Sequence, residues 1–259
     1  MTTPSKAQVK RWGKLLQEKY RRREGFFLAE GAKVVGELLR SGRPLEALLV
    51  REQRARRWGS LLTEAPPGAP LYRLSGREWE SLSQDLAPEG IMAVAAMTPP
   101  PKDSPASPPR GPLLLLYQVN NPNNLGALLR TAHWFGFAAV YLSQGSVEAT
   151  HPKVVRTSMG SLFHLTVVEE ADFEPLLRRL RGLFHVVGSD AREGIAPHPC
   201  GAATALLLGS ESHGLPAELL ALTGERWRIP GKGGAESLSL PQAAAVMMYE
   251  CTRETDPGR

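Results

Sequence analysis

The sequence predicts an α/β protein with a small N-terminal α/β domain and a larger C-terminal domain built on a parallel sheet. Two observations lead to this fold class. From residue 113 onward, short apolar runs alternate with segments of helical periodicity, which is the pattern of strand–helix–strand units. A proline-rich stretch at 98–112 lacks apolar periodicity and separates this half from the first. We therefore expect domains at 1–97 and 113–259, joined by a semi-rigid linker at 98–112.

Composition and length are those of an ordinary globular protein. The 259 residues are 42% hydrophobic and 22% charged, which excludes collagen-like, coiled-coil and disordered classes. No apolar stretch reaches the roughly 18 residues that span a bilayer, and residues 1–25 lack a signal-peptide centre, so we expect a cytoplasmic protein without membrane contact. Cys200 and Cys251 belong to no CxxC pair, and the histidines form no HExxH motif. The sequence therefore predicts no metal, and the two cysteines are expected to be small core residues.

Helices and short strands alternate in the N-terminal half. Apolar side chains recur every three or four positions over residues 5–23 and over Gly31–Arg40, which predicts two helices. Short apolar runs predict strands at 26–29, 47–50, 71–74 and 91–97, with a helix at 77–83. This mixture predicts a small α/β domain.

Positive charge is concentrated in the same half. Residues 1–110 hold 19 Lys and Arg against 12 Asp and Glu, whereas residues 111–259 hold 12 against 14. Eight basic side chains lie within residues 1–24, on the first predicted helix. Such a face binds a nucleic-acid backbone or is simply solvated, and both interpretations stay open at this point.

The C-terminal half begins with the order strand, turn, helix, strand. The apolar run Leu113–Val119 is followed by NNPNN, a helix at Leu125–Phe135 and a strand at Ala138–Leu142. Further strands are expected at 185–188, 205–209 and 227–229, and further helices at 173–180, 217–222 and 242–251. Strands that are apolar on both faces predict a buried parallel sheet.

Three loops after predicted strands are candidate ligand sites, because parallel sheets bind ligands beyond the carboxyl ends of their strands. They are NNPNNLG at 120–126, GSESHGLP at 209–216 and IPGKGGAESLSL at 229–240. No GxGxxG follows the first strand and no GxxxxGK[ST] is present, so neither a nicotinamide site nor a P-loop is supported. Ser210 does not lie in a GxSxG elbow, which argues against a serine hydrolase.

The order of these loops resembles a known family. NPNNLGALLRTA, LLLGSESHGLP and RIPGKGGAESLSL are similar to motifs one, two and three of the SpoU/TrmH branch of the SPOUT methyltransferases, and VVRTSMGSLFHLTV resembles the family's middle segment. FLAEGAKVVGELLRSG and EGIMAVAAM resemble its N-terminal substrate-binding domain. The resemblance implies a trefoil-knotted parallel sheet, a homodimer, and methyl transfer from S-adenosylmethionine to a ribose 2′-hydroxyl of RNA.

The matched motifs imply a cofactor site and a catalytic arginine. Gly209, Ile229 and Leu238 fall on positions whose backbone holds the adenosyl group, although Ile229 and Leu238 by themselves would suggest core packing. Arg130 matches the motif-one arginine that acts on the 2′-hydroxyl, and in isolation it would be an ordinary surface residue. Because a guanidinium does not readily lose its proton, we expect Arg130 to bind the adjacent phosphate and to stabilise negative charge developing on O2′.

Asn124 and Glu211 are candidate catalytic residues of motifs one and two. The resemblance implies that Asn124 orients Arg130 or the ribose, and its plainer interpretation is a turn residue in an Asn-rich loop. Glu211 would hold the arginine or orient the sugar, and its plainer interpretation is a surface-loop acid.

Motif three contributes Ser237 and Ser239 as candidate catalytic residues and departs from the family pattern. Ser237 would cap the last helix or contact the substrate. The family commonly reads SLNVS, so Ser239 replaces asparagine and Pro241 replaces serine, and Gly231 stands where methionine is frequent. Because a serine lacks the reach of an asparagine amide, the departure concerns catalytic efficiency more than cofactor binding.

The resulting expectation is an S-adenosylmethionine-dependent RNA 2′-O-ribose methyltransferase. Ribosomal RNA is favoured over transfer RNA as its substrate because of the N-terminal resemblance. The alternative is a non-catalytic RNA-binding or ribosome-assembly protein that kept the fold while motif three changed.

Overall fold

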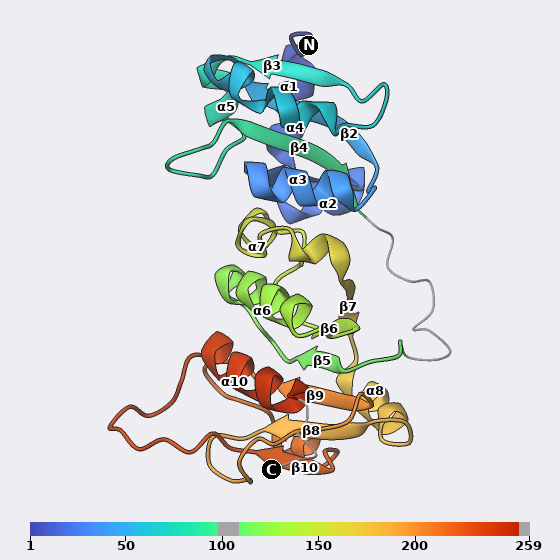
Figure 1. The fold of residues 1–259 in the computed structure, drawn as a ribbon, viewed down its shortest axis with the longest axis vertical. Coiled ribbons are helices and arrows are strands. Elements are labelled where there is room, and N and C mark those ends of the chain that lie inside the picture. Colours follow the sequence, from blue (N-terminus) through green and yellow to red (C-terminus); the bar gives the residue numbers. More distant parts are fainter. Residues whose placement is uncertain (98–108, 254–259) are drawn as a thin grey trace. The chain divides into compact units, whose positions relative to one another are not determined.

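The computed structural model describes residues 1–97 and 109–253, so most of the expected linker at 98–112 lies outside the described residues. Packing divides the chain into two units, drawn in Figure 1. The first comprises Met1–Pro99 with Thr150–His164, and the second comprises Pro100–Ala149 with Leu165–Arg259. The segment that resembles the family's middle segment therefore packs with the N-terminal unit, a grouping that no sequence pattern indicated.

A four-stranded mixed sheet in the order β1-β4-β2-β3 forms the centre of the first unit. The central strand β4 is antiparallel to both neighbours, whereas β3 is parallel to β2. The strands are β1 (Phe26–Glu30), β2 (Leu45–Arg51), β3 (Leu71–Leu74) and β4 (Ile91–Ala96). The helices are α1 (Lys6–Lys14), α2 (Glu18–Glu24), α3 (Ala32–Arg40), α4 (Gly59–Thr63), α5 (Gly76–Glu80) and α7 (Pro152–Thr157), with 3₁₀ helices η1 (Glu52–Trp58) and η2 (Ser161–His164).

The single helix expected over 5–23 is wrong, because the chain forms α1 and α2 with a break between them. Leu15 ends α1, and Gln17 adopts an extended conformation before α2. Arg21 explains the break, since its guanidinium donates to the carbonyl oxygen of Leu15 at 2.6 Å and is only 1% exposed. A buried cation needs such an acceptor, so Arg21 holds the two helices together instead of facing solvent.

The second unit contains a six-stranded sheet in the order β10-β8-β9-β5-β6-β7, in which all neighbouring strands are parallel. All residues of β5 and β9 are buried, which confirms the prediction of a parallel sheet covered on both faces. The strands are β5 (Leu113–Leu116), β6 (Ala139–Ser143), β7 (Thr166–Ala171), β8 (His185–Ser189), β9 (Thr204–Leu208) and β10 (Glu225–Trp227). The helices are α6 (Pro122–Trp134), α8 (Phe173–Leu180), α9 (Ala217–Leu220) and α10 (Leu240–Thr252).

Two helical layers cover this sheet. Leu113 and Leu115 of β5 pack in one cluster with α8 and α9. Because side chains alternate along a strand, Leu114 and Leu116 face the opposite layer, where α6 and α10 pack side by side (Figure 1).

Three strands of this unit differ from the sequence prediction, and one of them, expected over 227–229, is observed as β10 at Glu225–Trp227. Edge strand β7 was not predicted, because its sequence TVVEEA is half-exposed and carries two acids. The strand expected over Leu113–Val119 stops at Leu116, because Gln118 adopts φ 49° and turns the chain out of the sheet.

Candidate active site

The site begins where β5 and β9 end side by side. From these strands the chain proceeds to opposite parts of the sheet, from β5 to its neighbour β6 and from β9 across β8 to β10. Such a switch point leaves a crevice at the carboxyl ends of the two strands, and ligands of open parallel sheets bind there. The loops of motifs one and two leave the sheet at this place.

Motif one is held by the start of α6. The side chain of Asn121 caps the helix by accepting a hydrogen bond from the N–H of Asn123 at 2.9 Å. Pro122 follows in the first turn, where a missing N–H costs nothing. This cap fixes Asn124 in the first turn. The side-chain amide of Asn124 donates to Oε1 of Glu211 at 2.5 Å. Two predicted site residues that are 87 positions apart are thus in contact.

Motif two forms a tight loop between Gly209 and Leu215. Ser210 and Gly214 exchange backbone hydrogen bonds of 3.2 and 3.0 Å, and Gly214 has φ +66°. The backbone of Gly214 comes so close to Gly209 that a Cβ there would lie 2.2 Å from the Gly214 carbonyl carbon. Only glycine fits at position 209, which is one of the predicted cofactor positions.

Motif three is an irregular and largely exposed loop. Ile229 is half-buried and Leu238 is 48% exposed, so Leu238 is not a core residue. Within the described residues, no backbone hydrogen bond joins positions 229–238 to another part of the main chain. Free backbone donors and acceptors beside an exposed leucine suit the adenosyl group expected there, since an adenine edge needs hydrogen bonds and its faces need apolar cover.

Ser239, and not Ser237, caps the last helix. The N–H and hydroxyl of Ser239 both donate to Oε1 of Gln242, at 3.3 and 2.9 Å, in a capping box at the start of α10. Pro241 lies in the first turn, where proline is favoured. Ser239 and Pro241, which depart from the family pattern, therefore both stabilise the start of the helix. Ser237 is left exposed in the loop.

Arg130 lies apart from the pair of Asn124 and Glu211. It is exposed on α6, six residues after Asn124, which places it about 9 Å further along the helix at 1.5 Å per residue. Among the described residues it has no ion pair, and Glu211 is bonded to Asn124 instead. The guanidinium is thus available to an anion from outside the protein.

A second recess at the carboxyl edge of the sheet was missed by sequence reasoning. It has a volume of about 320 Å³ and is lined by residues at or just after the ends of β5, β6 and β7, among them Gln118, Ser143 and Asp172, and by residues of α8 and α9. The N–H of Gln118 donates to the buried hydroxyl of Ser143 at 2.8 Å. None of the described residues that line this recess is a predicted site residue, and no sequence signal marks it.

Three basic side chains of the first unit lie around the ring of a tyrosine. The cations of Lys14, Lys19 and Arg23 lie 5.4, 4.9 and 4.7 Å from the ring centre of Tyr20. An aromatic ring among cations suits a nucleic-acid strand, which offers stacking bases and phosphates. Arg21 does not belong to this group of cations, because its side chain is buried between α1 and α2.

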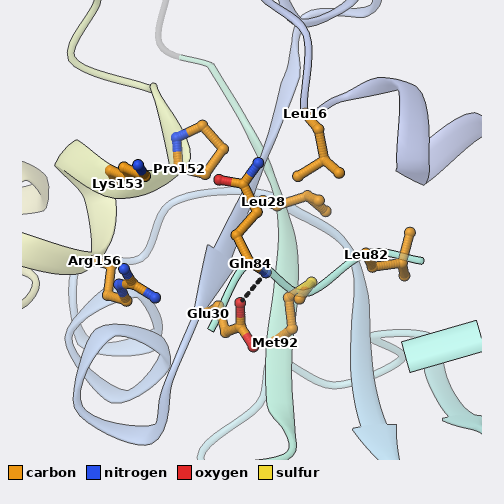
Figure 2. A pocket seen from close by; sticks show the side chains of 9 residues that line it. All are labelled: Leu16, Leu28, Glu30, Leu82, Gln84, Met92, Pro152, Lys153 and Arg156. Carbon is orange, nitrogen blue, oxygen red and sulfur yellow. Dashed lines mark hydrogen bonds between the residues drawn. The ribbon is translucent and has the colours of Figure 1, made fainter. Parts of the chain in front are cut away.

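A small recess between β1, β4 and α7 is a gap in the packing of these elements and not a ligand site. Figure 2 shows Glu30 facing the N–H of Gln84, with Lys153 and Arg156 of α7 nearby. Its volume of about 10 Å³ admits roughly one water molecule. Burial raises the pKa of Glu30 although Ser83 and Gln84 donate hydrogen bonds to it. The recess is too small for a cofactor.

In the described part of the chain, no cluster of three or more His, Cys, Asp or Glu could hold a metal ion. Over the same residues, no helix is long and apolar enough to cross a bilayer.

Comparisons with known proteins identify the family of this chain. Residues 111–249 match the SpoU rRNA Methylase family, and residues 6–93 match the MRM3-like substrate binding domain. The chain is 31% identical to the 23S rRNA (guanosine(2553)-2′-O)-methyltransferase RlmP of Bacillus subtilis, over 93% of this chain and 94% of that one.

Solved structures show the same fold over nearly the whole chain. The SpoU methyltransferase AviRb of Streptomyces viridochromogenes, in complex with AdoMet, is similar with a TM-score of 0.83 and 26% identity, covering 98% of this chain and 100% of the other. A crystal structure of an RNA 2′-O ribose methyltransferase is similar with a TM-score of 0.82 and 29% identity, covering 96% of both chains. The chain belongs to the SpoU rRNA methylase family.

Proposed function

We propose that the chain methylates a ribose 2′-hydroxyl of ribosomal RNA with S-adenosylmethionine as donor. The observation that carries the proposal is the contact between Asn124 and Glu211, which joins motifs one and two at the switch point of the sheet. The curated relatives RlmP and the uridine(2479)-2′-O-methyltransferase of Streptomyces viridochromogenes are both named for 23S rRNA, which favours ribosomal over transfer RNA. The proposal includes a cytoplasmic location, which is supported by the bacterial origin of the relative RlmP, named for 23S rRNA.

The cofactor would be held by the main chain of motifs two and three. Gly209 keeps the motif-two backbone free of side chains, and positions 229–238 offer unpaired amides and carbonyls beside Ile229 and Leu238. When bound, S-adenosylmethionine supplies an electrophilic methyl group on a sulfonium. No protein nucleophile is needed, so the work of the side chains is to place O2′ in line with that methyl group.

Arg130 would act on the RNA and not as a base. Its exposed guanidinium would bind the phosphate next to the target ribose and stabilise negative charge on O2′ as the proton leaves. Asn124 would orient the sugar, and Glu211 would fix the amide of Asn124 by accepting its hydrogen bond. Ser237, exposed in motif three, remains a candidate for substrate contact, whereas the hydroxyl of Ser239 is committed to Gln242.

The first unit would hold the RNA. The cations around Tyr20 supply backbone contacts and a stacking ring, and RNA is commonly recognised through splayed bases and shape. We expect binding that weakens steeply with salt, because phosphate contacts release counterions.

The proposal includes a trefoil-knotted sheet and a homodimer. Support for a dimer comes from apolar side chains left exposed on the α6 and α10 layer, namely Trp134, Val246 and Tyr249, of which Trp134 is 83% exposed. The ring centres of Phe135, at the end of α6, and Tyr249, on α10, lie 6.2 Å apart. The exposed side chain of Tyr249 therefore lies beside the end of α6 that carries Trp134. We expect Trp134→Glu to convert dimers into monomers in light scattering, whereas Leu183→Glu, at an exposed leucine after α8, leaves the mass unchanged.

The testing experiment is transfer of radiolabelled methyl from S-adenosylmethionine to unmodified ribosomal and transfer RNA. We expect alkali-resistant label at one dinucleotide of ribosomal RNA and a loss of about 100-fold or more in Arg130→Ala. Arg181→Ala, which removes an exposed arginine after α8, is the matched control and should retain full activity. Near-normal turnover by Arg130→Lys would contradict a role that depends on the planar guanidinium.

Label in transfer RNA alone would refute the ribosomal substrate. RNA binding without any transfer, on naked RNA and on ribosomal particles, would favour the non-catalytic alternative. The changed motif three is the observation behind that alternative, and the capping role of Ser239 weakens it, because the substitution has a structural use.

A further inference from the structure

The two cysteines of the chain are far apart in sequence and adjacent in the fold. Cys200 lies just before β9, and Cys251 lies in the last turn of α10. The backbone N–H of Cys200 donates to the carbonyl oxygen of Cys251 at 3.0 Å. The thiol of Cys200 donates to the carbonyl oxygen of His198 at 3.5 Å, and the two cysteines are close enough that each shifts the pKa of the other. The sequence contains no other cysteine, so this pair has no competing partner within the chain.

The backbone contact sets a spacing that a disulfide can bridge. With N–Cα, Cα–C and C=O bonds of about 1.46, 1.52 and 1.23 Å, the N···O distance of 3.0 Å keeps the two Cα atoms within about 6.5 Å of each other. Disulfides span Cα separations of about 4.4–6.8 Å. At such a spacing the bond requires rotation of side chains and no rearrangement of the main chain.

Solvent reaches the two thiols unequally. Cys251 is 1% exposed, and burial raises its pKa to about 12. Cys200 is only half-buried, and burial raises its pKa as well. A small oxidant therefore reacts first with Cys200, and the buried Cys251 acts as the resolving thiol. Raised pKa values mean that the reaction is slow and that the reduced pair is inert without an oxidant.

We propose that Cys200 and Cys251 are a modification site at which a peroxide forms an intramolecular disulfide. The sulfur of Cys200 attacks one peroxide oxygen, the O–O bond breaks, and a sulfenic acid and one water form. The sulfur of Cys251 then attacks the Cys200 sulfur, an S–S bond forms, and hydroxide leaves with the Cys251 proton as a second water. The two thiols lose two electrons and two protons, and hydrogen peroxide is reduced to water.

The bond would close a loop over the cofactor half of the chain. Between Cys200 and Cys251 lie β9, motif two, β10, motif three and α10, with Gly209, Ile229 and Leu238 among them. Closing such a long loop restricts the unfolded chain and stabilises the folded one. The site lies at the amino end of β9 and not at the carboxyl end, so the bond restrains the end of α10 without occupying the candidate active site.

The test uses the full chain, reduced and then exposed to hydrogen peroxide. We expect free thiols to fall from two to none, the intact mass to drop by about two units, and the chain to remain a single covalent species on a non-reducing gel. The midpoint of thermal unfolding should rise by roughly 5–15 °C and return after dithiothreitol. A tryptic map should contain one peptide pair joined through Cys200 and Cys251. None of these readouts requires methyl transfer.

Variants make the interpretation decisive. Cys200→Ser should fold, since the position is half-buried, and its unfolding midpoint should not rise with peroxide. Persistent thiols in the wild type, oxygen addition at Cys200 without a cross-link, or covalent dimers would each overturn the proposal. If Cys251→Ser fails to fold, the mass and peptide map of the wild type still decide the outcome.

Discussion

The loops after β9 and β10 carry motifs two and three, which form the proposed cofactor site, and their main chains are held in opposite ways. Motif two is closed by two backbone hydrogen bonds between Ser210 and Gly214, so its shape is set before any ligand arrives. The stretch 229–238 has exposed side chains and, in the described chain, no main-chain hydrogen bond. Unpaired backbone groups at the surface cost little in water and are available to a ligand. We therefore expect motif two to keep its shape and the segment 229–238 to become ordered when the cofactor binds.

The largest effect should come from adding one methyl group to the rigid loop. In Gly209→Ala the new Cβ would lie 2.2 Å from backbone that cannot rotate away, so the loop must open. We expect the free energy of unfolding to fall by about 3 kcal/mol and cofactor affinity to be lost, measured by urea denaturation and calorimetric titration.

Gly231→Ala is the control in the open segment. A Cβ there meets nothing within 4 Å, and its stability should change by less than about 0.5 kcal/mol. Equal losses of unfolding free energy in Gly209→Ala and Gly231→Ala would contradict the difference in rigidity between the two loops.

The open segment should be cut by trypsin at Lys232 and protected by the cofactor. Exposed loops without hydrogen bonds open at almost no free-energy cost. A ligand at about ten times its Kd should slow cleavage at Lys232 about tenfold, because only the unbound fraction is cut. Cleavage at Arg192, which is exposed in the loop after β8, should stay unchanged. Rapid cleavage at Lys232 in the presence of saturating S-adenosylmethionine would show that the segment does not close over it.

The fold was more predictable from sequence than the site. The strands of the second unit were predicted because runs such as Leu113–Leu116 are apolar on both faces. Edge strand β7 was missed because an exposed strand needs no apolar run. The packing of Thr150–His164 with the first unit was not predictable, since apolar residues in a segment do not say which core they enter.

Within the site, the motifs predicted a set of candidate residues but not which of them are in contact. Glu211 was expected to hold Arg130 or orient the sugar, and the structure pairs it with Asn124. The choice between Ser237 and Ser239 as helix cap depends on where α10 begins, and sequence locates helix ends only to within a few residues.

A smaller effect is expected where the open segment ends, at the cap of α10. Ser239→Ala removes the hydroxyl that bonds Gln242 and should lower the free energy of unfolding by about 1 kcal/mol. Ser237→Ala should change it by less than about 0.5 kcal/mol, because Ser237 is exposed in the loop. Urea denaturation of the two variants side by side measures the difference. A greater loss for Ser237→Ala would place the cap at the wrong serine.

The smallest effect should come from the bond that ties the rigid loop to α6. The hydrogen bond from Asn124 to Glu211 is charge-assisted but exposed, so water competes for both groups. A double-mutant cycle with Asn124→Ala and Glu211→Ala should give a coupling of about 0.5 kcal/mol in stability. If the pair positions the ribose, either single variant should lower kcat far more than this coupling, while KM for S-adenosylmethionine stays near its normal value. Losses in kcat no larger than the coupling would mean that the contact only fastens two loops, and the preformed wall of the site would then depend on Gly209 and the Ser210–Gly214 hydrogen bonds alone.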